Sequence, residues 1–175
     1  MGFKWFTFFL LALLCMSFVL QKGLNKTVDK EIQETFGIEH YSIGVKQIPS
    51  VTLQELPSKF DDDNFLEIKA ENEQVGYAYI SKAPSKTDQF DYLILLDNNL
   101  TILKAKVLVY REDYGGEIGS KRWLKQFIGK NPDDELKYKE NIAAISGATI
   151  SVRSMTNAVN DLLKSLKILH SKHIL

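Results

Sequence analysis

The sequence predicts an α+β fold, in which an antiparallel sheet has flanking helices and follows an N-terminal transmembrane or signal helix. Two observations lead to this prediction. Strand-like runs succeed one another with short polar turns between them, as in antiparallel hairpins. Helical patterns come after these strands instead of alternating with them, which favours α+β over α/β. With 175 residues, the chain is long enough for one domain with a substantial core.

Composition excludes several classes of function. Apolar residues make up 45% and charged residues 25%, which is typical of a globular protein. The 22 basic residues balance the 22 acidic ones, and no basic patch is interleaved with aromatics, so nucleic acid is not an expected partner. Cys15 is the only cysteine, which excludes an internal disulfide, a cysteine-rich zinc site and a cysteine-held iron–sulfur cluster. The histidines show no metal-ligand spacing, so we expect no metal.

The N-terminal segment has the layout of an export signal. Residues from Trp5 to Leu20 are nearly all apolar, Lys4 precedes them, and Gln21 and Lys22 end the run. No A-x-A-like cleavage site follows, so an uncleaved signal anchor is favoured over a cleaved signal peptide. A lipoprotein is the third alternative. The positive-inside count mildly disfavours an external domain, but so short a segment is typical of export. We therefore expect a cytoplasmic-membrane protein whose domain faces the extracytoplasmic side.

The chain divides into three parts. Residues 1–24 are the signal anchor or signal peptide, 25–60 a juxtamembrane helix with a connector, and 61–175 the main domain. The helix is expected over Asn25–Phe36 and ends at Gly37. Residues 38–60 are expected to be irregular. Four strands should follow, over Phe65–Lys69, Gly76–Ser81, Tyr92–Leu96 and Leu100–Tyr110, with turns at 71–73 and 97–99.

Two helices are expected after the strands. A glycine-rich loop over 111–119 leads to Ser120, which can cap a helix that ends near Gly129. That helix has Trp123, Leu124, Phe127 and Ile128 on one face. The final helix follows Thr149 and has apolar residues at helical spacing: Val152, Met155, Val159, Leu162, Leu166 and Leu169.

The most informative motif is Ser146-Gly147-Ala148-Thr149, directly ahead of this final helix. Glycine and alanine let the backbone approach a ligand closely, and a helix start offers free N–H groups with a partial positive charge. This combination suits a phosphate, and it presents the Thr149 hydroxyl as a group that a phosphate could esterify. The alternative is an ordinary helix start, where Ser, Thr and Gly are common.

A second candidate segment lies in the glycine-rich loop. Gly115 and Gly116 could simply provide positive φ in a strand-to-helix turn. Both this loop and the Ser146 motif open helices and border the same expected sheet. The two segments could therefore present backbone N–H groups to a common cleft.

The sequence resembles a known family through these two segments. Ile145-Ser146-Gly147-Ala148-Thr149 and the run REDYGGEIGSKRWLKQFIGK at 111–130 are similar to the FMN-binding domain. That domain occurs in small covalent-flavin subunits of the sodium-pumping NADH:quinone reductase and of Rnf complexes, and in stand-alone membrane-anchored proteins. The large-complex subunits usually have a proline where this chain has Tyr114-Gly115-Gly116, so the resemblance is closer to the stand-alone members.

The resemblance implies a cofactor and the residues that hold it. In the family, an extracytoplasmic flavin transferase takes FMN from FAD and joins its phosphate to the last threonine of the motif as a phosphoester. That threonine is Thr149 here. The implied cofactor-binding residues are Thr149, Ser146, Gly147, Ala148, Ile150, Ser151, Glu112, Gly115, Gly116 and Glu117. Ser146 is expected to cap the helix or bond the phosphate, and the glycine-loop backbone is expected to lie against the flavin ring.

The expected function is therefore that of a membrane-anchored flavoprotein that relays electrons between membrane or periplasmic redox partners. Two alternatives stay open. One is a small flavin-dependent reductase, although the chain leaves little room for a substrate domain. The other is a non-redox envelope binding module in which the Ser146 motif is only a helix start.

Overall fold

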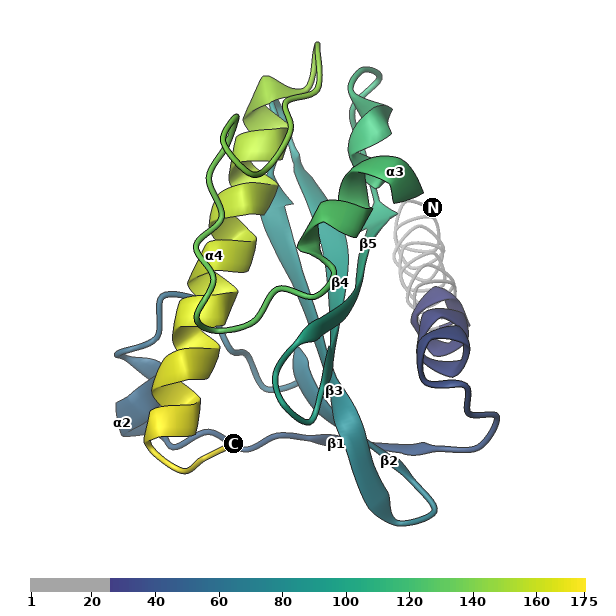
Figure 1. Ribbon diagram of the computed structural model, residues 1–175, viewed down its shortest axis with the longest axis vertical. Coiled ribbons are helices and arrows are strands. Elements are labelled where there is room, and N and C mark those ends of the chain that lie inside the picture. Colours follow the sequence, from purple (N-terminus) through teal and green to yellow (C-terminus); the bar gives the residue numbers. More distant parts are fainter. Residues whose placement is uncertain (1–25) are drawn as a thin grey trace, which may run out of the picture.

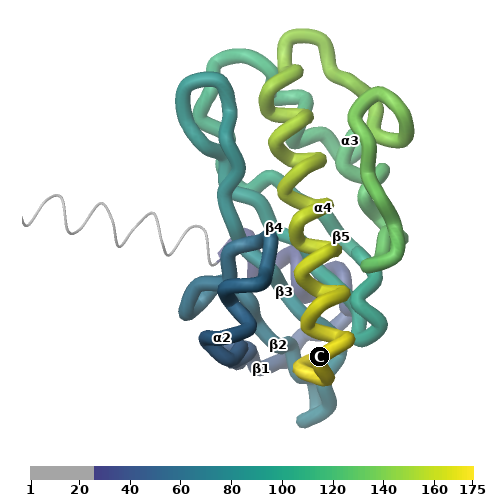
Figure 2. Tube along the Cα trace, turned by 90° about the vertical axis from the view of Figure 1, so that its left-hand side faces the viewer, coloured from purple at the N-terminus to yellow at the C-terminus, as the bar shows by residue number. Residues whose placement is uncertain are grey.

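The computed structural model describes residues 26–175, which form three layers (Figure 1). The middle layer is a five-stranded antiparallel sheet in the order β1-β2-β3-β4-β5. A helix over residues 26–36 lies against one face, and α4 (Thr149–Ser171) crosses the other (Figure 2). The α+β class and the antiparallel sheet are thus confirmed. The expected N-terminal signal segment lies outside the described residues, and within 26–175 no helix is long and apolar enough to cross a membrane.

All four predicted strands are present. They are β2 (Phe65–Ala70), β3 (Glu73–Pro84), β4 (Gln89–Asp97) and β5 (Ile102–Val109). The predicted turns join them. Glu71 and Asn72 both have positive φ, as a tight hairpin requires. In the second turn, the Asp97 carboxylate accepts bonds from the amides of Asn99 and Thr101 at 2.9 and 2.8 Å.

The segment expected to be irregular contains two short elements, so that part of the prediction was wrong. β1 (Ser42–Val45) pairs with β2 at the edge of the sheet, and α2 (Ser50–Leu53) follows it. All four residues of β1 are exposed. Ile43 and Val45 do alternate with Ser42 and Gly44, but a run of four residues that contains a glycine is too short to predict a strand.

The main core lies between the sheet and α4. The six apolar residues predicted for the buried face of the final helix are all buried, so this expectation is confirmed. All of them except Leu169 belong to one core cluster with aromatic residues of the sheet, which include a ring stack between Phe65 and Tyr77 and a tilted pair between Tyr79 and Tyr92. This packing sets the direction of α4 and therefore the position of its first residue, Thr149.

The opposite face of the sheet is covered by residues 26–36. Val28 and Ile32 are buried against β2, β3 and β4, and a Cβ at Gly76 would come within 2.8 Å of the Phe36 ring. The predicted stop at Gly37 is confirmed, because this glycine has φ +67° and its amide donates to the Gln33 carbonyl at 2.9 Å.

A buried carboxylate fastens the same helix to β5. Glu31 pairs with Lys104 at 2.9 Å and with Lys106 at 3.0 Å. Burial alone raises the pKa of Glu31, but the two lysines outweigh that effect and lower it. The helix is therefore held by charge as well as by apolar packing.

Three short helical elements connect β5 to the site. These are η1 (Gly116–Gly119), α3 (Lys121–Leu124) and η2 (Lys125–Phe127). Ser120 caps α3 as predicted, because its hydroxyl accepts a bond from the Trp123 amide. Trp123, Leu124 and Phe127 are buried as expected. The prediction that Ile128 shares the buried face of this helix was wrong. The helix has ended at Ile128, where the backbone is extended, and this residue is 48% exposed.

Candidate functional site

The two candidate segments meet at one end of the sheet. Gly115 has φ +82°, and a Cβ built on it would lie 2.9 Å from the Cβ of Ala148. Any side chain at position 115 would therefore collide with the Ser146 motif, and an L-residue would also be strained at this φ. The structure thus brings the glycine-rich loop against the residue that immediately precedes Thr149.

A tyrosine joins the same two segments by hydrogen bonds. The Tyr110 hydroxyl donates to the Tyr114 carbonyl at 3.1 Å and lies 3.0 Å from the Ser151 Oγ. Ser151 is only 3% exposed. Because its hydroxyl is buried and engaged by Tyr110, it is not available to a ligand, and only its backbone amide can contribute to binding.

The N-terminus of α4 is left without a cap. Ala148 is the N-cap residue, and no side chain of residues 26–175 caps the helix. The cap expected of Ser146 is therefore not formed. The first backbone bond runs from the Val152 amide to the Ala148 carbonyl at 2.9 Å. In the part of the chain that the structure describes, the amides of Thr149, Ile150 and Ser151 have no acceptor, and they carry the positive end of a 23-residue helix.

The approach to these amides is open. Thr149, Ser146 and Gly147 are exposed. Apart from the glycine itself and its chain neighbours, no atom of residues 26–175 lies within 4 Å of the position a Cβ would take at Gly147 or Gly116. Gly147 has φ +80°, which explains the glycine. Gly116 has neither a positive φ nor a crowded neighbour, so nothing in the described part of the protein requires a glycine there. Space of this kind suits a ligand that approaches the backbone closely.

A groove lies beside the point where the two segments meet. It encloses about 510 Å³, within the range of roughly 300–1,000 Å³ that small-molecule sites occupy. It runs between the helical elements after β5 and the chain that leads into Ser146. Its lining residues are Glu117, Ser120, Arg122, Trp123, Lys125, Gln126, Ala143, Ala144 and Ile145.

Comparison with known families indicates a ligand for the domain that contains this region. Residues 86–164 match the model of the FMN-binding domain. The chain carries an FMN-binding domain. The match contains both candidate segments and all ten predicted site residues, and it makes the protein a flavin-binding one. No curated protein matches the chain.

Glu112 has a structural task within the FMN-binding domain. Its carboxylate accepts bonds from the Ser85 hydroxyl at 2.6 Å, from the amide and hydroxyl of Thr87, and from the Asp88 amide. These bonds, that of Ser85 first, lower the pKa of Glu112 to about 2. The carboxylate therefore ties the β3–β4 loop to the glycine-rich loop, and only the Glu112 backbone is left to meet a ligand.

The remaining candidate side chains flank the site. Glu117 is exposed and lines the groove. Trp123 also lines it but is 5% exposed, with its indole N–H bonded to the Ala143 carbonyl at 2.8 Å, so core packing is its main role. Arg153 follows Thr149 by one helical turn, and its guanidinium lies 4.9 Å from the centre of the Tyr138 ring.

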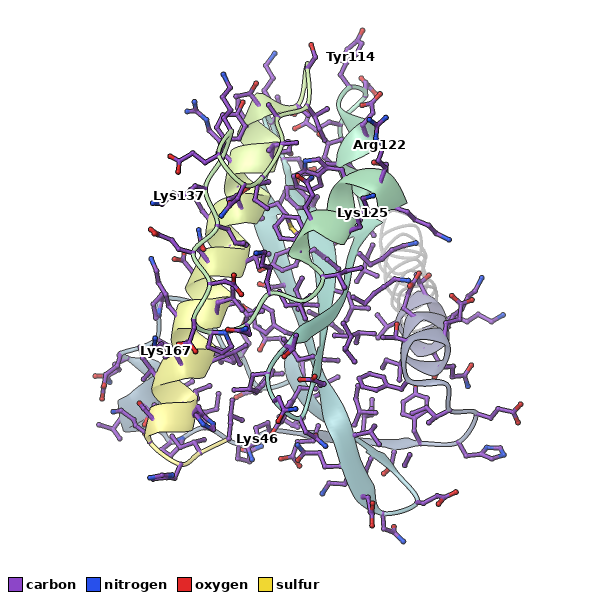
Figure 3. All side chains as sticks on the ribbon, viewed as in Figure 1. Lys46, Tyr114, Arg122, Lys125, Lys137 and Lys167 are labelled. Carbon is purple, nitrogen blue, oxygen red and sulfur yellow. The ribbon has the colours of Figure 1, made fainter. Side chains whose placement is uncertain are left out.

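The site also contains residues that sequence reasoning missed. Tyr110 had no signal of its own, because its bond to Ser151 spans 41 positions. Tyr114 did have a signal in the sequence, because it is an aromatic residue in a loop rich in glycine and charged residues. Figure 3 shows Tyr114 at the tip of the FMN-binding domain, with Arg122 and Lys125 on the helical elements below it.

Proposed function

We propose that this protein is an electron carrier that holds FMN through a phosphoester bond to Thr149. The observation that carries the proposal is the exposed threonine hydroxyl at an uncapped helix start, one residue from the contact between Ala148 and Gly115. An exposed hydroxyl can be esterified, whereas the hydroxyl of Ser151 cannot be reached without breaking its bond to Tyr110.

The phosphate fits the backbone around this threonine. The free amides at residues 149–151 donate toward an anion, and the helix dipole favours negative charge at this end. Arg153 is exposed and has no carboxylate partner in the described part of the chain. Its side chain can therefore turn toward the phosphate and supply the positive charge, while Gly147 leaves the approach open.

The linkage requires a donor that carries an activated phosphate. The Thr149 oxygen forms the new bond to the flavin phosphorus of FAD, the pyrophosphate bond breaks, and adenosine monophosphate leaves with the electrons of that bond. The threonine proton goes to a base on the transferase that catalyses the step. No atom changes oxidation state, so no oxidant or reductant is required.

The cellular role follows from this attachment. When bound, FMN supplies reversible electron transfer, and the protein sets the position and electrostatic surroundings of the ring. We place the domain on the extracytoplasmic side, held by the N-terminal segment and exchanging electrons with membrane or periplasmic partners. A covalent bond prevents loss of the flavin there.

The test is to produce the protein together with a flavin transferase and to look for flavin fluorescence in the denatured gel band. We expect a fluorescent band for the natural sequence and for Ser146→Ala, and a dark band for Thr149→Val. A dark band for the natural sequence would refute the linkage and favour a non-redox envelope module. Faster turnover with soluble acceptors than with a partner protein would instead favour a flavin reductase.

A further inference from the structure

One aromatic side chain at the site has no partner among the residues that the structure describes. Tyr114 is 84% exposed, more than any other large apolar residue in the described range. Its hydroxyl makes no hydrogen bond within residues 26–175; only its carbonyl is engaged, by Tyr110. Both faces of the ring are therefore free, at the tip that Figure 3 displays.

The loop that carries Tyr114 is nevertheless held firmly. On one side, the Glu112 carboxylate binds the β3–β4 loop through Ser85, Thr87 and Asp88. On the other side, Tyr110 bonds the Tyr114 carbonyl itself. Such bracing fixes the backbone of residue 114, so that its ring stands at a defined place in solvent.

That place is next to Thr149. Gly115 contacts Ala148, and Tyr114 and Thr149 are the chain neighbours of these two residues. A flavin tethered to the Thr149 hydroxyl can move its ring no farther than the phosphate and ribityl chain allow. Tyr114 lies within the distance that this tether spans, and its aromatic ring is exposed to solvent.

We propose that the phenol ring of Tyr114 stacks on the isoalloxazine ring of the attached flavin. The inference rests on the proposed linkage at Thr149. Offset stacking of two aromatic rings removes apolar surface from water and adds a specific attraction. It would also limit the tethered ring to one orientation, with its other face left open to a redox partner.

The groove beside the site is the competing place for the ring. Its aromatic residue, Trp123, is 5% exposed and already contacts Phe127 edge-on at 5.2 Å between ring centres. It is therefore almost fully covered by the protein, whereas the Tyr114 ring is largely exposed. For this reason the observations favour the tip of the loop over the groove.

The experiment measures the fluorescence lifetime of the attached flavin, because a stacked tyrosine or tryptophan quenches flavin emission. We expect Tyr114→Leu to lengthen the lifetime severalfold and to make the flavin more sensitive to iodide. Tyr114→Trp should keep it short. Because the side chain is exposed, both variants should melt at the temperature of the natural protein. Arg122→Ala, on the groove, is the matched control and should leave the lifetime unchanged.

Three results would overturn the inference. In the first, Tyr114→Leu leaves the lifetime unchanged while Arg122→Ala alters it, which would place the ring in the groove. In the second, neither variant has an effect, which would leave the ring free in solvent. In the third, Tyr114→Leu slows only electron transfer to a partner protein, which would make Tyr114 a docking residue. Each variant is also run on a denaturing gel, so loss of the covalent flavin itself is recognised separately as failure of the linkage.

Discussion

The hydroxyl of Tyr110 lies 3.0 Å from the Oγ of the buried Ser151, across a sequence separation of 41 residues. This contact joins the end of the sheet to the first turn of α4. The hydrogen bonds of Tyr110 therefore help to hold the glycine-rich loop and the Ser146 motif in a fixed position relative to each other.

Removal of the Tyr110 hydroxyl should weaken the attachment between these two segments. Tyr110→Phe leaves the Ser151 hydroxyl and the Tyr114 carbonyl without their partner, so we expect a loss of about 1–2 kcal/mol in the free energy of unfolding. Urea unfolding of Tyr110→Phe, Ser151→Ala and the double variant checks this. The double variant should lose less than the sum of the single losses; strict additivity would show that the contact contributes nothing.

Substitution of Gly115 should be far more damaging than substitution of its neighbour. Gly115→Ala introduces strain at φ +82° and a contact of 2.9 Å with Ala148, which together should cost about 3 kcal/mol. Gly116→Ala has open space and no positive φ, so its melting temperature should be nearly unchanged. However, its methyl group would point into space that we assign to the ligand. Reduced flavin attachment in a stably folded Gly116→Ala protein would bear that assignment out, and unaltered attachment would contradict it.

The β3–β4 loop should detach in acid. The pKa of Glu112 is lowered from 4.5 to about 2 in the folded protein. Its contribution is therefore complete above about pH 4.5 and is lost as the pH falls toward 2. The amides of Thr87 and Asp88 donate to this carboxylate, so their protection factors, which compare exchange with that of an unstructured peptide at the same pH, should fall through that range. In Glu112→Gln the protection factors should be low throughout and nearly independent of this titration; a parallel acid response of the protection factors in both proteins would refute the assignment.

Glu31 should matter to the attachment of the N-terminal helix. Glu31→Ala removes the carboxylate between Lys104 and Lys106, while both lysines can still turn to water. We expect a loss of about 2 kcal/mol, with the helix over 26–36 exchanging its amide hydrogens faster than the sheet. Lys30→Ala, which breaks an exposed pair with Glu34 on the same helix, is the control and should cost less than about 0.5 kcal/mol.

The sequence predicted those parts of the fold that have a strong periodic pattern. The long apolar stripe of α4 is buried along the helix, so its residues could be assigned from the sequence. β1 has no buried face, and Ile128 follows a helix that tightens and stops one residue early. The alternation of Ile43 and Val45 in β1 is too short to be distinctive, and the apolar Ile128 continues the helical pattern although the helix has ended.

The two segments of the candidate site could be predicted from the sequence, but the contact between them could not. Small residues, hydroxyls and a helix start pointed to a phosphate at Ser146–Thr149. The contact between Gly115 and Ala148 depends on how β5 and α4 cross the sheet, which local patterns do not encode. For the same reason, the engagement of the Glu112 carboxylate by the β3–β4 loop emerged only from the structure.

The most direct test of the central claim is the position of the flavin within one tryptic peptide of the protein produced with a flavin transferase. Cleavage after Lys139 and Arg153 releases residues 140–153, which contain three hydroxyls, those of Ser146, Thr149 and Ser151. Fragment-ion spectra should place the added FMN mass on Thr149 alone. The same mass on Ser146 or Ser151, or an unmodified peptide, would contradict the account.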